Sequence, residues 1–450
     1  MRRQNEERFF FTAAVSAPSD RLIFTFPRGG LSGEIKSPSV ALLRVKELLG
    51  ISEYRFGSDS ADMLYCREAA LRSAGTAEDP AVRALIAEKC GVTQAAPPLT
   101  DTVARVTTVG NEINLTPSRT DRYSLCAFSF FARYLLKLRE NRRAEFSAPE
   151  IGTFVHKILE EFVSGRCPDG EYRPADREAI SAEADRLTDE YILSVVGEQG
   201  DSPRFRYSVA RFKRTLRLIM ANINNEFAQS GFSPSGTEVR IGMGDLPAVE
   251  IPAGYGKVRL CGIIDRTDTC VIDGRTYLRV VDYKTGKKRF SLEKVGKGLD
   301  MQMLMYLFAC CAADRTGNTY PAGVLYMPAY PPEVNSDGGD SDEYIELTAE
   351  KSIRKSGLVL ADPDVIRAME RDGGGVFIPV KLNRDGTVSA RGTSAKTLEE
   401  FDRLKDELTE RISDMGKKLI SGNMDISPLK DGRENACRFC EYKAFCRYRA

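Results

Sequence analysis

The sequence has no tryptophan, a single histidine and no long apolar run. A membrane-spanning helix needs about 18 consecutive apolar residues, so the sequence predicts no membrane span and no membrane partner. The formal net charge is only +1, and overall charge therefore does not indicate a nucleic-acid-binding protein. The G-x-x-x-x-G-K-[S/T] pattern that cradles nucleotide phosphates is also absent, which excludes ATP hydrolysis by that mechanism.

The remaining composition is that of a globular protein. Hydrophobic residues make up 42% and charged residues 29% of the 450 residues, a balance typical of soluble globular chains. This length allows two or three domains with sizeable cores. Several of the eleven cysteines lie in apolar runs, which predicts reduced thiols in a cytoplasmic protein.

One stretch organises the rest of the chain. Two runs rich in β-forming residues, 258–272 and 275–284, flank the dipeptide Asp273-Gly274. Asp-Gly is a preferred pair for a two-residue type I′ turn. The sequence therefore predicts a β-hairpin here.

This hairpin would present two acids and a lysine at one place. Side chains alternate across a strand, so Asp282 and Lys284 share a face while Tyr283 points to the other. Asp265 ends the partner strand, and adjacent carboxylates repel each other unless a cation lies between them, which favours Mg²⁺ or Mn²⁺. A lysine beside such a metal can steady a hydroxide nucleophile. The alternative is a surface hairpin with an ordinary salt bridge.

Two helical segments could contribute to the same site. In the segment 300–306, Gln302 and Tyr306 are four residues apart and lie on one face of a helix. The segment 151–162 has the apolar stripe of an amphipathic helix. His156, the only histidine, lies at the edge of that stripe, where it is either a packing residue or a metal ligand.

In combination these residues resemble the RecB-family nucleases of the PD-(D/E)xK superfamily. The family pattern is a helical histidine, then G-h-h-D-R, D-Y-K-T-G and Q-x-x-x-Y, where h is hydrophobic. It is matched in order by His156, by 262–266, by 282–286, and by Gln302 with Tyr306. The resemblance implies an α/β, restriction-endonuclease-like fold, in which a mixed central sheet is flanked by helices and interrupted by helical insertions.

The resemblance also implies roles for individual residues. The metal ligands that it implies are His156, Asp265, Asp282, the Tyr283 carbonyl and Glu238, which matches an acid expected ahead of G-h-h-D-R. Lys284 would orient the nucleophile and stabilise the phosphorane charge. Gln302 and Tyr306 would position the lysine or the phosphate. The residues expected to contact DNA are Lys287, Lys288 and Arg266.

Three segments are expected along the chain. Residues 1–45 resemble a degenerate last helicase motif of superfamily 1, as found in the AddB subunit of bacterial AddAB helicase–nucleases; the alternative is a small αβ capping element. Residues 46–110 are expected to form a helical segment and linker, and 111–450 the nuclease domain. Because AddB proteins are far longer, the chain is expected to be a C-terminal fragment or a truncated gene product.

The C-terminal cysteines form a second candidate site. The C-x-x-C-x₅-C pattern supplies three thiolates, Cys437, Cys440 and Cys446, and such soft ligands bind zinc or iron–sulfur clusters. The family resemblance implies Cys126 as the fourth ligand and a [4Fe–4S] cluster that closes the nuclease domain. Zinc is the alternative.

These expectations combine into a metal-dependent DNA exonuclease of the AddB type. Its substrate would be single-stranded or unwound DNA ends in recombinational double-strand break repair, with an AddA-type helicase–nuclease as partner. Two alternatives stay open: a stand-alone, Cas4-like iron–sulfur nuclease, and a non-catalytic DNA-binding scaffold. The second would be marked by loss of an acid or the lysine, and none is lost.

Overall fold

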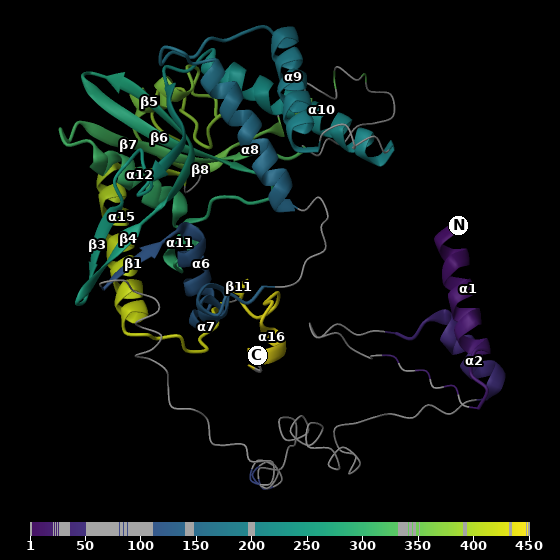
Figure 1. Ribbon diagram of the computed structural model, residues 1–450. Helices are drawn as coiled ribbons and strands as arrows, with labels where there is room; N and C mark the ends of the chain where they lie inside the picture. Colours follow the sequence, from purple (N-terminus) through teal and green to yellow (C-terminus); the bar gives the residue numbers. More distant parts are fainter. Residues whose placement is uncertain are drawn as a thin grey trace. The chain divides into compact units, whose positions relative to one another are not determined.

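The computed structural model divides the chain into two compact units (Figure 1). One comprises Met1–Leu99 with Cys437–Ala450, and the other comprises Thr100–Ala436. The structure describes residues 2–20, 22, 24, 26, 37–50, 81, 84, 88, 111–139, 148–196, 203–331, 341, 344, 348–350, 352–389, 394–431, 434–446 and 448.

The smaller unit contains short helical elements. They are α1 (Arg2–Ser16), α2 (Val40–Leu49) and α16 (Lys443–Cys446). Ser39 caps α2 by accepting a hydrogen bond from the Leu42 backbone N–H, and Gly50 ends the helix in the left-handed conformation. Most of the expected helical segment and linker at 46–110 lies outside the described residues, so the three-segment division of the chain stays a prediction.

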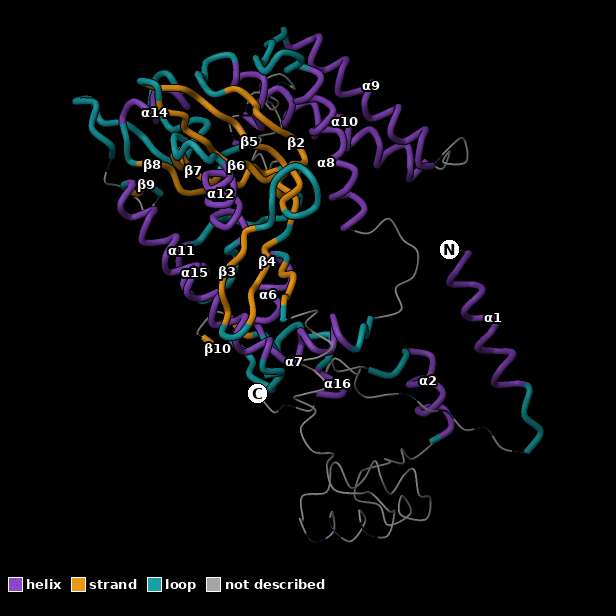
Figure 2. Tube along the Cα trace, turned by 60° about the vertical axis from the view of Figure 1, so that its left-hand side comes forward, coloured by secondary structure: helices purple, strands orange, loops and turns teal. Residues whose placement is uncertain are grey.

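The larger unit is built around a six-stranded sheet. Its order is β2-β5-β6-β7-β8-β9, formed by Ser233–Ile241, Gly262–Ile272, Arg275–Lys284, Thr319–Pro328, Ser356–Leu360 and Ala395–Lys396. The β6/β7 and β8/β9 pairs are parallel and the others antiparallel. The expected mixed central sheet is therefore confirmed, and Figure 2 shows its strands side by side.

The hairpin β5–β6 has the expected turn. Asp273 and Gly274 have φ angles of 49° and 76°, and positive φ at both central residues is what a type I′ turn requires. The strands pair from Ile272 opposite Arg275 to Arg266 opposite Val281.

The sequence predicted that 258–272 forms one strand, and this is wrong. The chain changes sheets at Cys261 and forms two strands here. Residues before this point form β4 (Gly256–Leu260), which pairs with β1 (Glu112–Leu115) and β3 (Val249–Ala253) in a separate three-stranded sheet. Residues after it form β5 in the large sheet.

Helices flank the sheets, as expected. The described ones are α6 (Pro117–Leu125), α7 (Ala127–Phe130), the π-helix η2 (Phe131–Leu135), α8 (Ala148–Gly165), α9 (Arg177–Val196), α10 (Pro203–Phe227), α11 (Leu292–Gly296), α12 (Gln302–Ala313), α14 (Pro363–Met369) and α15 (Leu398–Ile420). A two-stranded ladder, β10 (Lys430–Asp431) with β11 (Glu434–Asn435), follows α15. Within these ranges, none of the helices combines the length and apolarity needed to cross a membrane.

Helices cover both faces of the large sheet. Helix α12 packs on β6 and β7 and reaches Asp282 through Gln302. Helix α10 reaches Arg279 through Glu226. Because Asp282 and Arg279 point to opposite faces of β6, α12 and α10 lie on opposite sides of the sheet. Strand β6, which carries Asp282 and Lys284 at its end, is thus contacted by helices on both faces of the sheet.

Candidate active site

The end of β6 brings a carboxylate and an ammonium together. Asp282 is 4% exposed, and its Oδ2 forms an ion pair with Nζ of Lys284. Its Oδ1 accepts a hydrogen bond of 3.3 Å from Nε2 of Gln302, at the first turn of α12. The expected convergence of these three side chains is therefore present.

Asp265 faces the same place from β5, just beyond the last hairpin pair. Its Oδ2 accepts a hydrogen bond of 2.7 Å from the Tyr283 backbone N–H, and its Oδ1 lies 3.4 Å from Nδ1 of His156. The other imidazole nitrogen, Nε2, lies 2.9 Å from the Tyr283 carbonyl oxygen. The two backbone groups of Tyr283 thus have different partners, because its N–H contacts Asp265 and its carbonyl contacts His156.

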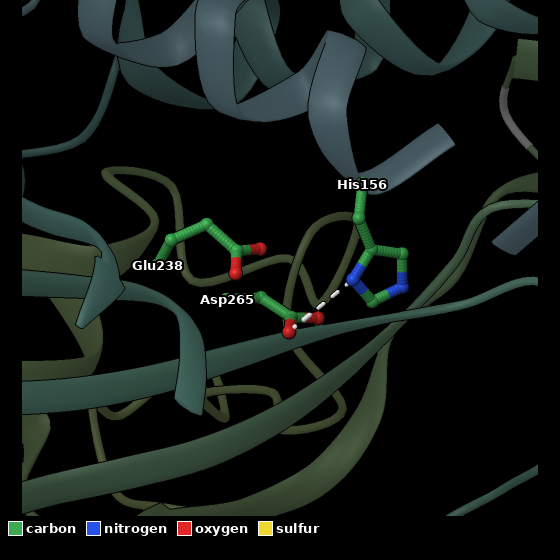
Figure 3. A group of neighbouring side chains, drawn as sticks. All are labelled: His156, Glu238 and Asp265. Atoms are coloured by element: carbon green, nitrogen blue, oxygen red, sulfur yellow. Dashed lines mark ion pairs between the residues drawn. The ribbon is translucent and has the colours of Figure 1, made fainter. Parts of the chain in front are cut away.

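Glu238 completes a cluster of possible metal ligands. One ligand atom each of His156, Glu238 and Asp265 lies within 4.8 Å of the other two, and Figure 3 shows the three side chains pointing toward one another. In β2, the neighbours of Glu238 pair with the neighbours of Asp265. Glu238 itself has φ of 48°, a conformation that glutamate rarely adopts and that often marks a functional position.

The electrostatics of this cluster favour a bound cation. Burial raises the pKa of Asp282 to about 6, and Asp265 raises it in the same direction. Burial and then Asp265 raise the pKa of Glu238. Burial lowers the pKa of His156, but hydrogen bonding and charge from Asp265, with the charge of Asp282, outweigh burial and raise it. The carboxylate of Asp265 thus repels those of Asp282 and Glu238, and a divalent cation would relieve that repulsion.

Tyr306 packs on the start of β5. Burial raises the pKa of the Tyr306 hydroxyl, and the nearby Gln302 side chain and Ile263 backbone act in the opposite direction. A Cβ at Gly262 would lie 2.2 Å from that hydroxyl oxygen, so only glycine leaves room for the ring. The expected pairing of Gln302 with Tyr306 is present, and it explains the glycine of the G-h-h-D-R motif.

Two acids that the sequence did not single out lie beside the lysines. Nζ of Lys288 is 2.5 Å from Oδ1 of Asp300, and the Asp300 backbone N–H donates a 2.9 Å hydrogen bond to Oδ1 of Asp121. Burial raises the pKa of Asp121 to about 6, with Asp300 acting in the same direction. No local pattern signals this pair, because Asp121 and Asp300 are far apart in the sequence.

Arg266 does not reach the surface. Its side chain is fully buried, its Nε lies 2.9 Å from Oδ1 of Asp268, and its Nη2 lies 3.7 Å from Glu226. Arg266 follows Asp265 in β5, so strand alternation turns it to the opposite face of the sheet. A side chain without exposed surface cannot contact DNA, and the prediction that Arg266 binds DNA is wrong.

The four candidate cluster cysteines belong to different units, with Cys126 in the larger one and the other three in the smaller one. Cys126 is buried between α6 and α7. Cys437 and Cys440 lie at the two ends of one turn, in which the Cys440 backbone N–H donates to the Cys437 carbonyl at 3.5 Å. The nine cysteines that the structure describes carry thiols rather than disulfides.

Comparison with known proteins gives one family and one group of relatives. Residues 114–447 match the profile of the PD-(D/E)XK nuclease superfamily. The chain is 33% identical over 347 residues to a protein of Thermoanaerobacter sp. (strain X514) and 31% identical over 355 residues to one of Clostridium acetobutylicum. Both carry the name of one subunit of an ATP-dependent helicase/deoxyribonuclease, and each match covers 75% of this chain and 30% of the relative.

The chain thus spans under a third of the length of the curated relatives that it matches. The family profile, by contrast, covers most of the chain, including both strands of the hairpin and the helices that carry His156 and Gln302. The chain belongs to the PD-(D/E)XK nuclease superfamily.

Proposed function

We propose that this chain carries the catalytic site of a metal-dependent DNA exonuclease of the AddB type. The observation that supports this most directly is the meeting of Asp265, Asp282 and Lys284 at one end of the β5–β6 hairpin, with His156 and Glu238 beside Asp265. The name of the relatives, which includes deoxyribonuclease, supports DNA as the substrate.

The donor set fits Mg²⁺ or Mn²⁺. Carboxylate and carbonyl oxygens are the ligands that these hard cations prefer, and an imidazole suits Mn²⁺ as well. The residues that would hold the ion are Asp265, Asp282, Glu238, His156 and the Tyr283 carbonyl. When bound, the cation would polarise the scissile phosphodiester and lower the pKa of a water molecule.

The surrounding side chains would orient the substrate and supply positive charge. Nζ of Lys284 lies 4.8 Å and Nζ of Lys288 5.8 Å from the centroid of the Tyr326 ring, so two ammonium groups gather beside the acids. Lys284 would stabilise the charge that develops on the phosphate. Gln302 would hold Asp282 in position, and Lys287 and Lys288 would contact the DNA backbone.

Asp282→Ala tests the proposed function. In a labelled single-stranded DNA assay with Mg²⁺, the wild-type chain should release nucleotides and stop when EDTA is added. The variant should lose this activity, because one carboxylate ligand is gone. Cleavage by the variant at the wild-type rate would contradict the proposal.

Asp169→Ala is the matched control, because Asp169 is an exposed aspartate whose ion pair is with the neighbouring surface residue Arg173. This variant should cleave like the wild type. If the wild-type chain binds DNA but never cleaves it with Mg²⁺ or Mn²⁺, the rival function of a non-catalytic scaffold is supported instead.

The same relatives support a proposal about the cellular setting. We infer that the chain processes DNA ends for recombinational double-strand break repair in the cytoplasm, together with an AddA-type helicase–nuclease. The relatives are named as one part of a larger enzyme, which supports a partner, and the reduced cysteines suit that compartment. Co-purification with an AddA-type chain tests the partnership.

Cys126, Cys437, Cys440 and Cys446 are proposed to bind one [4Fe–4S] cluster, with zinc as the alternative. Their C-x-x-C turn and their thiol state support a metal site. Anaerobically purified protein should be brown, and Cys440→Ser should bleach it, whereas Cys167→Ser should keep the colour. A colourless wild-type protein that holds one zinc would overturn the iron–sulfur chemistry.

A further inference from the structure

Five charged side chains form a cluster in the core, on the face of the hairpin opposite to Asp282. They are Glu226, Arg266, Asp268, Arg279 and Lys355, and none of the five side chains has any exposed surface. Burying so many ions carries a large desolvation cost, and apolar residues of similar volume often stabilise a core equally well. Stability alone is therefore a weak reason for this cluster.

The cluster is internally paired across several elements. Arg279 of β6 donates a 2.8 Å bond from Nε to Asp268 of β5, and its Nη2 lies 3.1 Å from Glu226 of α10. Nζ of Lys355, just ahead of β8, lies 2.8 Å from Glu226. Asp268 also holds Arg266, through Nε at 2.9 Å and Nη2 at 3.1 Å. Arg266 is thus fixed in place by neighbours from α10 and β5.

One contact leaves the cluster and leads to the metal site. Nη1 of Arg266 donates a 3.1 Å hydrogen bond to the hydroxyl of Tyr283, and the Tyr283 ring is buried on the same face. The backbone of Tyr283 contacts Asp265 through its N–H and His156 through its carbonyl. The positions of these two backbone groups, on either side of the Tyr283 Cα, therefore depend on where the ring of the same residue is held.

We propose that the buried charge cluster positions the metal ligands, with the Arg266–Tyr283 hydrogen bond as the connection. This inference rests on the proposed function. The cluster fixes Arg266, Arg266 fixes the Tyr283 ring, and the ring fixes the backbone N–H and carbonyl of Tyr283, which orient Asp265 and His156. Tyr283 and Arg266 are positioning residues, and this role replaces the DNA contact expected of Arg266.

Tyr283→Phe tests the connection, because it removes only the hydroxyl. Outer contacts that orient metal ligands typically change metal affinity about 10- to 100-fold, so the variant should bind Mn²⁺ at least about 10-fold more weakly than the wild type. Isothermal titration of the folded, DNA-free chain measures this directly. If the hydroxyl were purely structural, its loss would lower the unfolding temperature and leave the Mn²⁺ affinity unchanged.

Tyr277→Phe is the matched control. Tyr277 lies on the same strand and the same face and is also buried, but its ring packs on Tyr320, at 5.9 Å between centroids. The Mn²⁺ affinity of this variant should equal that of the wild type.

Asp268→Asn carries the test further into the cluster. It should weaken Mn²⁺ binding in the wild-type background and have little additional effect in the Tyr283→Phe background, because both changes act through Arg266. Additive losses would contradict the proposed route.

The outcomes separate this inference from the proposed function. The proposed function fails, and the inference with it, if the wild-type chain does not bind Mn²⁺ or if Asp265→Asn leaves that binding unchanged. If that site exists and Tyr283→Phe binds Mn²⁺ as tightly as the wild type, only the inference is overturned.

Discussion

Lys284 holds its ammonium between a carboxylate and an aromatic ring. It pairs with Asp282, and its Nζ lies 4.8 Å from the Tyr326 ring centroid. The ring attracts the cation electrostatically, and the ion pair partly neutralises a buried acid. The lysine is therefore held beside the proposed metal ligands rather than left free in solution, as a group that stabilises charge during the reaction must be.

Lys284→Met should reduce turnover much more than DNA binding. Loss of one electrostatic contact that acts in the transition state typically costs about 100- to 1,000-fold in kcat, whereas the other lysines proposed to contact the DNA backbone would remain. Single-turnover cleavage and fluorescence anisotropy measure the two quantities separately.

Lys257→Met is a suitable control, because Lys257 also pairs with carboxylates on a strand but lies in the small sheet. It should leave both quantities unchanged. If Lys284→Met lost DNA binding as severely as turnover, Lys284 would be a phosphate anchor instead.

At the level of elements, the geometry of the candidate active site depends on how closely α12 approaches β5. Tyr306 of α12 occupies the space above Gly262, where a Cβ would be only 2.2 Å from its hydroxyl oxygen. The same helix supplies Gln302, which bonds to Asp282. A shift of α12 away from β5 would thus also move Gln302, which holds the proposed metal ligand Asp282.

Gly262→Ala should therefore displace Tyr306 or the helix. Forcing an extra carbon into a packed region typically costs about 1–3 kcal/mol, and turnover should fall because Gln302 moves as well. Urea unfolding and the DNA cleavage assay measure the two effects. Gly296→Ala, at a position with nothing within 4 Å of the added carbon, should change neither, and equal behaviour of the two variants would contradict this explanation.

For the whole molecule, the buried charge cluster joins elements that are distant in sequence. Glu226 in α10 neutralises Lys355 and Arg279, which lie more than fifty residues further along the chain. Although burial acts to raise it, the charges of Lys355, Arg279 and Arg266 lower the pKa of Glu226 to about 2. The ionised carboxylate is therefore strongly favoured in the folded state.

Glu226→Gln should destabilise the fold in a pH-dependent way. Because the pKa of Glu226 is about 2 in the folded protein against an ordinary value of 4.5, its stabilisation is complete above pH 4.5 and disappears as the pH falls toward 2. At pH 7 the difference from the wild type should be about 3 kcal/mol. Urea unfolding of both proteins from pH 7 downward should show the difference shrinking below pH 4.5, and a constant difference would contradict this assignment.

Local patterns were sufficient to predict the hairpin and part of the site. The Asp273-Gly274 turn, the shared face of Asp282 and Lys284, and the pairing of Gln302 with Tyr306 each depend on residues close in sequence. Such features follow from strand alternation and helical spacing alone.

Features that depend on distant partners could not be predicted in this way. The neutralisation of the buried Arg266 depends in part on Glu226, and the pairing of Lys288 depends on Asp300, whose backbone bonds to Asp121. The change of sheet at Cys261 depends on β1, which is far away in the sequence. Strand alternation places Arg266 on the face opposite to Asp265, but it does not show which distant element covers that face.

The left-handed backbone at Glu238 has an evolutionary consequence. A glutamate with φ of 48° carries strain of about 1–3 kcal/mol, whereas glycine or asparagine adopts this conformation readily. Variants selected only for heat resistance should therefore drift toward glycine or asparagine at 238. Variants selected for metal-dependent DNA cleavage should keep the acid, because the strained residue is the one that completes the cluster with His156 and Asp265.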